Sequence, residues 1–192
     1  NEVLAQDEIT QLLEPKVLTN VKRIDKDGEK QIKSFNRDAE LNKKRCLPEN
    51  TISDNLFIKG NNLLALQTLK EEFAGKIKLI YIDPPYNTGN DGFNYNDSFS
   101  ESTWLTFMHN RLHIARKLLS PNGCIFISLD DRQLAELKLI CDSVFGKTNF
   151  LADIIWNSTK SVTNTALISV SHTHTLVYFL NKDYYVKNRT EF

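Results

Sequence analysis

The sequence predicts an α/β fold with a mainly parallel sheet and helices on both faces. Apolar, strand-like runs such as IKLIYI and CIFISLDD alternate with amphipathic runs that read as helices. Strands and helices in this order give a parallel sheet joined by right-handed crossovers. The chain has 192 residues, 41% of them hydrophobic, which is enough for one domain with a real core.

Residues 1–54 are polar and charge-rich and are expected to form an N-terminal extension. Within them, Asp7–Leu13 is predicted to be a short helix. The stretch KVLTNVKRIDKDGEKQIKSF has β-branched and polar residues on both sides of Asp27-Gly28, a pair that favours a tight turn. We therefore expect a β-hairpin after the helix.

Residues 55–158 carry the alternating pattern. NLFIKG is predicted to be a short strand, and Asn61 or Asn62 can cap the helix NLLALQTLKEEF, which Gly75 ends. The run IKLIYI has the apolar content of a strand buried on both faces of a parallel sheet.

The second half of this region repeats the alternation. Ser100 can cap a long helix over Glu101–Leu119, which the turn SPNG closes. CIFISLDD is the next buried strand, Asp130 or Asp131 starts the helix RQLAELKLICDSVF, and Gly146 stops it before the strand LADIIW. Residues 159–192 read as a polar loop and one more strand, TLVYFL.

Composition limits the function classes. No stretch approaches the roughly 20 apolar residues of a membrane span, and the N-terminus has acids where a signal peptide has basic residues, so we expect a cytoplasmic protein without a membrane partner. The three cysteines are widely separated and suggest neither disulfide nor zinc chemistry. A net charge of +0 gives no support for nucleic-acid binding, so such a function must be argued from a site.

The segment KIKLIYIDPPYNTGNDGFNYND contains the most informative loop. In open α/β sheets ligands bind beyond the carboxyl ends of the strands, where Asp83 is expected to lie. Pro84 and Pro85 stiffen the loop and have no N–H, so the Asp83 carboxylate and the nearby carbonyls form an edge that only accepts hydrogen bonds. Tyr86 adds a flat aromatic face. A nucleobase with an exocyclic amine would satisfy both features, whereas the alternative is a turn that merely ends a strand.

The segment IKLIYIDPPYNTG, together with STWLTFMHNRLHIARKLLSPNGCIFISLDD downstream, closely resembles the catalytic half of DNA amino-methyltransferases. The resemblance is to the β-order adenine-N6 enzymes and, among these, to the modification subunits of type III restriction systems. It runs from about Asn55 to Tyr185 and implies a Rossmann-like methyltransferase fold, here incomplete. In that family the segment matching Asp83, Pro84, Pro85 and Tyr86 is the catalytic DPPY motif, and its initial Asp favours adenine over cytosine.

The resemblance implies that a methyl group passes from S-adenosylmethionine to N6 of an adenine that is flipped out of duplex DNA. Cofactor contacts are expected from Asp83 and Pro84, with Asn61 and Asn87 as further candidates. Many relatives have an acid where this chain has Asn61, which alters that contact. For DNA contacts the candidates are Tyr86, Phe93 and Lys160, and the loop around Phe93 is a candidate lid whose alternative is a plain connection.

The family's glycine-rich cofactor turn is expected downstream of this chain, because no two of the seven glycines form a GxG pattern. The chain alone is therefore expected to be inactive, and residues 159–192 to lead toward a target-recognition region. Double-stranded DNA, a second copy of the subunit and a restriction subunit with helicase and nuclease activity are the implied partners. The alternatives are a cytosine-N4 or RNA amino-methyltransferase, or a non-catalytic module.

Several other polar residues are better explained by structural roles than by metal binding or catalysis. His172 and His174 have no carboxylate or cysteine nearby in sequence, so a polar start of a strand is preferred to a metal site, and no metal is expected. His109 and His113 lack the glutamate of a zinc-protease pattern and are interpreted as surface or packing residues. Asp130 and Asp131 precede a helix and are interpreted as caps.

Overall fold

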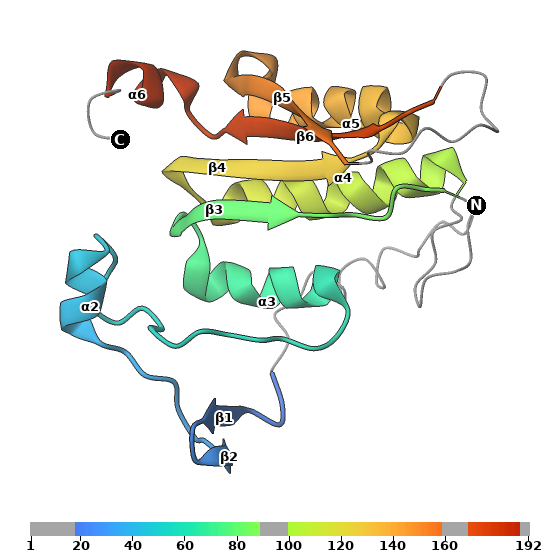
Figure 1. Cartoon of the computed structure of the whole chain (residues 1–192). Coiled ribbons are helices and arrows are strands. Elements are labelled where there is room, and N and C mark those ends of the chain that lie inside the picture. The colour runs from blue at the N-terminus through green and yellow to red at the C-terminus, as the bar shows by residue number, and fades with distance from the viewer. Residues whose placement is uncertain (1–17, 89–99, 159–168, 189–192) are drawn as a thin grey trace, which may run out of the picture. The chain divides into compact units, whose positions relative to one another are not determined.

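The structure is a computed structural model that describes residues 18–88, 100–158 and 169–188 (Figure 1). Contacts within the chain divide it into two compact units, Asn1–Lys76 and Ile77–Phe192, and each unit is described by itself. The functional division at residues 54 and 158 stays a prediction. No helix among the described residues combines the length and apolar character needed to cross a membrane.

The first unit contains the predicted hairpin. Strand β1 (Lys22–Asp25) pairs antiparallel with β2 (Gly28–Gln31). The turn between them is closed by a hydrogen bond from the Asp27 N–H to Oδ1 of Asp25 over 2.8 Å, and Gly28 has φ of 110°, which favours glycine. The helix predicted over Asp7–Leu13 lies outside the described residues.

Helix α3 (Asn62–Phe73) confirms both predicted ends. The side chain of Asn61 accepts a hydrogen bond from the Leu63 N–H over 2.9 Å, and Gly75 has φ of 68° just after the helix. The strand predicted for residues 55–60 is wrong: this segment forms no strand, and Phe57 is 93% exposed. Its apolar pattern is insufficient because a strand also needs a neighbour for its backbone hydrogen bonds.

A helix that the sequence analysis did not predict, α2 (Ala39–Lys44), lies between the hairpin and α3. Asp38 caps it, and Asn42 is fully buried and donates to the carbonyls of Glu49 and Thr51. The sequence signal was present, since an acid stands in its first turn and two lysines in its last.

The second unit contains a four-stranded sheet in the order β3-β4-β6-β5 (Figure 1). Its strands are β3 (Ile77–Ile82), β4 (Leu119–Leu129), β5 (Phe150–Asn157) and β6 (His172–Phe179). β3 and β4 are parallel, while β6 is antiparallel to both β4 and β5. Three strands therefore run in one direction and β6 in the other, which confirms an α/β fold and adds a reversed strand to the parallel pattern.

The helical segments of this unit are α4 (Glu101–Leu118), the 3₁₀ turn η1 (Asp131–Gln133), α5 (Leu134–Cys141), the π-type segment η2 (Asp142–Gly146), the 3₁₀ turn η3 (Lys147–Asn149) and α6 (Lys182–Lys187). The two helices predicted for this unit are present, the second of them divided into a 3₁₀ turn, an α-helix and a π-type segment, and helix α6 was not predicted. Ser100 caps α4 as predicted. The SPNG segment lies inside β4 and does not close the helix, because it forms an irregularity where the β3–β4 register shifts.

The core lies on one face of the sheet. Alternate residues of β4 and β6 pack there against α4 and α5: Trp104, Met108, Leu112, Ile125, Ile127, Leu129, Leu137, Leu176 and Tyr178. On the opposite face, Tyr185 of α6 stacks on Phe179 with ring centroids 3.7 Å apart. The expectation that β3 is buried on both faces is wrong, since Leu79 and Tyr81 are 55% and 61% exposed.

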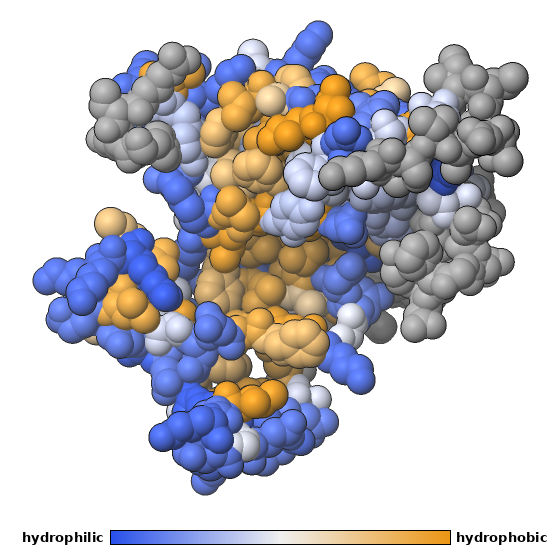
Figure 2. Space-filling model, in the orientation of Figure 1, coloured by the Kyte–Doolittle hydropathy of each residue, from blue (hydrophilic) through white to orange (hydrophobic). Residues whose placement is uncertain are grey.

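Strand β5 forms one edge of the sheet and exposes much of its apolar surface. Figure 2 shows hydrophobic side chains over this strand. Its exposed apolar and aromatic side chains are Leu151, Ile154, Ile155 and Trp156, all of them at least 47% exposed.

Candidate active site

The loop with Asp83 begins directly after β3. Strand β3 ends at Ile82, which pairs with Ile127 of β4, and both strands run in the same direction. Their carboxyl ends therefore meet at one edge of the sheet, which is where α/β proteins bind ligands. Asp83 is exposed at this edge, as the sequence predicted.

Tyr86 is bonded to Asp83. Its hydroxyl donates to Oδ1 of Asp83 over 2.7 Å, and its ring packs against the core. Burial, the hydrogen bond to Asp83 and the negative charges of Asp83 and Asp130 raise the pKa of Tyr86. The hydroxyl therefore keeps its proton at neutral pH and remains a donor.

Trp104 fixes the middle of the loop. Its indole N–H donates to the backbone carbonyl of Pro85 over 2.8 Å, and the side chain is fully buried in helix α4. Trp104 was not among the site residues predicted from the sequence. The available signal was chemical, since a buried tryptophan N–H nearly always needs an acceptor.

Three hydroxyl groups line the sheet face opposite the core near this edge. The Tyr81 hydroxyl lies 2.7 Å from Oγ of Ser128, which in turn lies 3.3 Å from Oγ1 of Thr175. These residues were not predicted from the sequence, because they come from three different strands.

Asp130 acts as a cap, in agreement with its sequence interpretation. Its Oδ1 accepts from the Arg132 N–H over 3.0 Å at the start of η1. Its charge also contributes to the raised pKa of Tyr86, which places Asp130 in the electrostatic environment of the loop.

The remaining candidates lie elsewhere or outside the described residues. Asn61 belongs to the first unit, where its side chain caps α3. Asn87 follows Tyr86 in the same loop and has φ of 57°, a conformation that asparagine tolerates better than most residues. Phe93 and Lys160 lie outside the described residues, and the roles expected of all four remain predictions.

The histidines at the start of β6 have carboxylate partners that the sequence analysis missed. His174 is bonded to Asp131 and Asp153, and His172 lies 3.5 Å from Asp131. These partners come from segments 21 and 43 residues away from His174, so sequence proximity could not reveal them. His109 and His113 are exposed on α4 with rings 4.5 Å apart, as expected of surface residues.

Comparisons with known proteins agree on one class of enzyme. A family model described as DNA methylase, N6_N4_Mtase, matches residues 77–191. A probable type III restriction-modification enzyme HindVI Mod subunit of Haemophilus influenzae is 48% identical over 160 residues, which cover 83% of this chain and 20% of that protein. The type III enzyme EcoP15I Mod subunit of Escherichia coli is 41% identical over 166 residues, covering 70% of this chain and 26% of that protein.

Among solved structures, the PvuII DNA methyltransferase, which is cytosine-N4-specific, is similar with a TM-score of 0.47 and 13% identity. The match covers 62% of this chain and 47% of the PvuII chain. The chain spans about a fifth to a quarter of the length of the Mod subunits that it matches. The family model covers more than half of the chain and includes the loop at Asp83. The chain therefore belongs to the N6_N4 DNA methylase family.

Proposed function

We propose that this chain is the amine-binding part of an adenine-N6 DNA methyltransferase, the modification subunit of a type III restriction-modification system. Membership of the N6_N4 family and identities of 48% and 41% to two type III Mod subunits support this assignment. The observation that carries it is the exposed Asp83 carboxylate at the carboxyl end of β3, bonded to Tyr86 in a loop that Trp104 holds.

Asp83 and Pro84 act as acceptors for the two hydrogens on N6 of adenine. One oxygen of Asp83 accepts from Tyr86, and a carboxylate has two oxygens with about four acceptor positions, so Asp83 can accept from N6 as well. The Pro85 carbonyl already accepts from Trp104, which leaves the Pro84 carbonyl to receive the second hydrogen. These two bonds localise and orient the nitrogen lone pair, combining orientation with electrostatic stabilisation.

The methyl donor in this proposal is S-adenosylmethionine, whose sulfonium supplies the methyl group. The acceptor loop suits the positive charge of the sulfonium, because the negative Asp83 carboxylate is exposed beside the position that N6 would occupy. Asp83, Pro84 and Asn87 are the residues of this loop that would contact it. The chain contains no GxG turn, so the 192 residues alone are expected to show no methyl transfer.

The ring of Tyr86 stacks on the adenine after the base leaves the duplex. Removing a base from the stack costs a few kcal/mol, and stacking on an aromatic ring offsets about 1–3 kcal/mol of that cost. Double-stranded DNA is therefore the substrate, and a restriction subunit and a second copy of the modification subunit are the proposed protein partners. A cytoplasmic location is part of this proposal.

The test is a substitution at Asp83 in the complete protein that carries this chain. Asp83→Ala should abolish methylation, while Asp183→Ala on helix α6 is the control that should leave methylation unchanged. Because Asp83 is exposed, the free energy of unfolding should change by less than about 1 kcal/mol. Methylation by Asp83→Ala near the rate of the unmodified protein would exclude the mechanism.

The modified base is identified by digesting the methylated DNA to nucleosides. N6-methyladenine is the expected product. Finding N4-methylcytosine would keep the enzyme class and overturn the substrate.

A further inference from the structure

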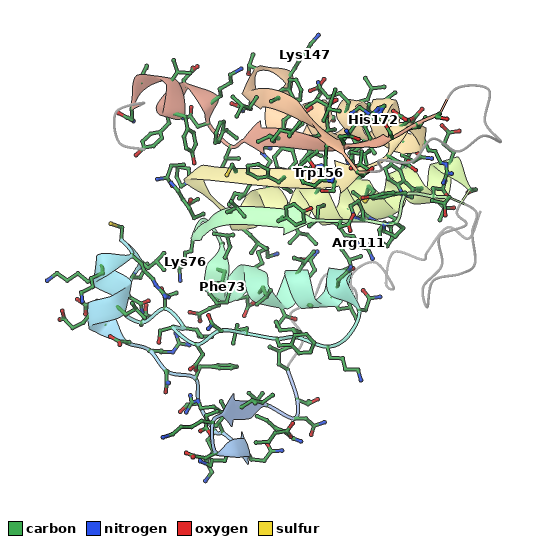
Figure 3. The ribbon with its side chains drawn as sticks, in the orientation of Figure 1. Phe73, Lys76, Arg111, Lys147, Trp156 and His172 are labelled. Atoms are coloured by element: carbon green, nitrogen blue, oxygen red, sulfur yellow. The ribbon has the colours of Figure 1, made fainter. Side chains whose placement is uncertain are left out.

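Four side chains gather at one end of the sheet in the second unit. His172 and His174 lie at the start of β6, Asp131 begins η1 after β4, and Asp153 lies on β5. His172 pairs with Asn157 in the sheet register, and Figure 3 shows His172 at the same end of the sheet as Trp156 of β5. The cluster is thus assembled from three chain segments by strand pairing.

We propose that Asp131, His172 and His174 bind one divalent transition-metal ion. Each residue offers one ligand atom, and these three atoms lie within 4.8 Å of one another. Nε2 of His174 is 2.9 Å and Nε2 of His172 is 3.5 Å from Oδ1 of Asp131. Ligand atoms about 2.1 Å from a shared ion stand roughly 3.0–3.4 Å apart at angles between 90° and 109°, so small side-chain movements complete the geometry.

Asp153 supports the ion from behind His174. Nδ1 of His174 lies 2.8 Å from Oδ2 of Asp153, while Nε2 faces Asp131. A histidine that binds a metal through one ring nitrogen usually donates its other N–H to a carboxylate, which fixes the tautomer and the ring orientation. His174 is also 6% exposed, so its ring is held by packing.

The charges of the cluster favour a dication. Among the described residues, Asp131 and Asp153 lie within ion-pair distance of these histidines and of no lysine or arginine. Two carboxylates beside neutral imidazoles carry a charge of −2, which a divalent ion would neutralise. Partly buried charges need such a partner because desolvation is otherwise unfavourable.

The ligand types select the class of metal. Two imidazoles and one carboxylate suit zinc and neighbouring transition metals, whereas magnesium and calcium prefer oxygen ligands alone. The side chains of Asp131 and His172 are 46% and 36% exposed, so an ion can enter from solvent and keep a water ligand. The competing state is a protonated His174 held between two carboxylates.

The proposal is tested by titrating the purified chain with Zn²⁺ in a calorimeter. The titration uses the double variant His109→Ala, His113→Ala as background, because that exposed pair stands one helical turn apart and could bind zinc by itself. One Zn²⁺ per chain should bind in this background, and Mg²⁺ should not replace it. Co²⁺ in the same background should give visible absorption bands from the bound ion.

Three substitutions then map the ligands. His172→Ala should abolish the zinc binding and the Co²⁺ bands, and it should fold because the side chain of His172 is 36% exposed. Asp131→Asn should do the same. Asp153→Asn should weaken binding about 10- to 100-fold, as expected for a residue that orients a ligand.

Two results would overturn the proposal: no zinc binding in the background variant, or unchanged binding after His172→Ala. Either result would mean that the cluster is an ion pair around a protonated histidine. Thermal unfolding without metal shows that each variant is folded, and if Asp131→Asn does not fold, His172→Ala decides alone.

Discussion

Tyr86 donates its hydroxyl hydrogen to Oδ1 of Asp83 over 2.7 Å, so the aromatic ring and the carboxylate of the proposed site are held together. The side chain of Tyr86 thus has two separable parts. Its ring offers a stacking surface, and its hydroxyl restrains the acceptor. Substitutions that remove one part or both can distinguish these contributions.

Tyr86→Phe keeps the ring and removes the restraint on Asp83. In the complete enzyme we expect a loss of about 0.5–1.5 kcal/mol in transition-state stabilisation, the range of an ordinary hydrogen bond, because Asp83 is exposed and water can replace the lost donor. Tyr86→Ala also removes stacking and should weaken capture of the flipped adenine by a further ~1–3 kcal/mol. Steady-state kcat and KM for DNA measure both effects. If the Phe variant is as impaired as the Ala variant, the hydroxyl matters and stacking does not.

Trp104→Phe tests whether the bond to Pro85 positions the loop. The variant keeps an apolar ring but leaves the Pro85 carbonyl without its indole donor, which should cost about 1–3 kcal/mol of stability. We expect kcat to fall more than the affinity for DNA, because the loop loses its orientation.

The matched control for Trp104 is Met108→Leu. Met108 is equally buried on the same helix, and a swap of similar volume disturbs packing by less than about 1.5 kcal/mol. A similar fall in kcat for both variants would assign the effect to packing and not to the hydrogen bond.

The loop of the proposed site could be predicted because its chemistry is contiguous in sequence. Asp83, the two prolines and Tyr86 follow one apolar strand, and the helix caps Asn61, Ser100 and Asp130 are local signals as well. Each of these features depends on residues within about four positions, so each can be recognised from the sequence alone.

Features that depend on distant segments could not be predicted. The reversed direction of β6 is set by pairing with β4 and β5, and the same pairing brings Asp131 and Asp153 to His174. The donation from Trp104 to Pro85 likewise spans 19 residues. Apolar periodicity says which residues are buried but not which element each one meets.

Asp142 should make the second unit sensitive to acid. Burial alone would raise the pKa of this carboxyl, but hydrogen bonds from Lys138 and Tyr178 outweigh burial and lower it below the ordinary value of 3.8. A carboxyl with a lowered folded-state pKa contributes stability above its unfolded pKa, and this stability is lost as the pH falls through the folded value.

Asp142→Asn should therefore destabilise the chain by about 1.5–3 kcal/mol at pH 7, the range for hydrogen bonds to a charged group. The difference from the unmodified chain should shrink below about pH 4. Urea unfolding at a series of pH values measures this, with Glu136→Gln on helix α5 as the control. A difference that stays constant down to pH 2 would contradict the assigned role of the charge.

Gly123 should not tolerate a larger side chain. It lies in β4 where the register with β3 shifts, and a Cβ at this position would stand 2.8 Å from the Ile77 carbonyl oxygen and 2.9 Å from that of Ser120. Both contacts are with backbone atoms, so the strands themselves must move to admit a methyl group. Overpacking of this kind costs about 1–3 kcal/mol.

We expect Gly123→Ala to lower the free energy of unfolding by that amount, as measured by urea unfolding followed by circular dichroism. The neighbouring exposed Pro121 offers the comparison, because Pro121→Ala adds no atom to the gap between β3 and β4. Equal stability of Gly123→Ala and the unmodified chain would show that the irregularity in β4 adapts freely. The φ of Gly123 lies outside the range that requires glycine. A loss of stability confined to Gly123→Ala would therefore identify the close approach of β3 and β4 as the reason for glycine at this position.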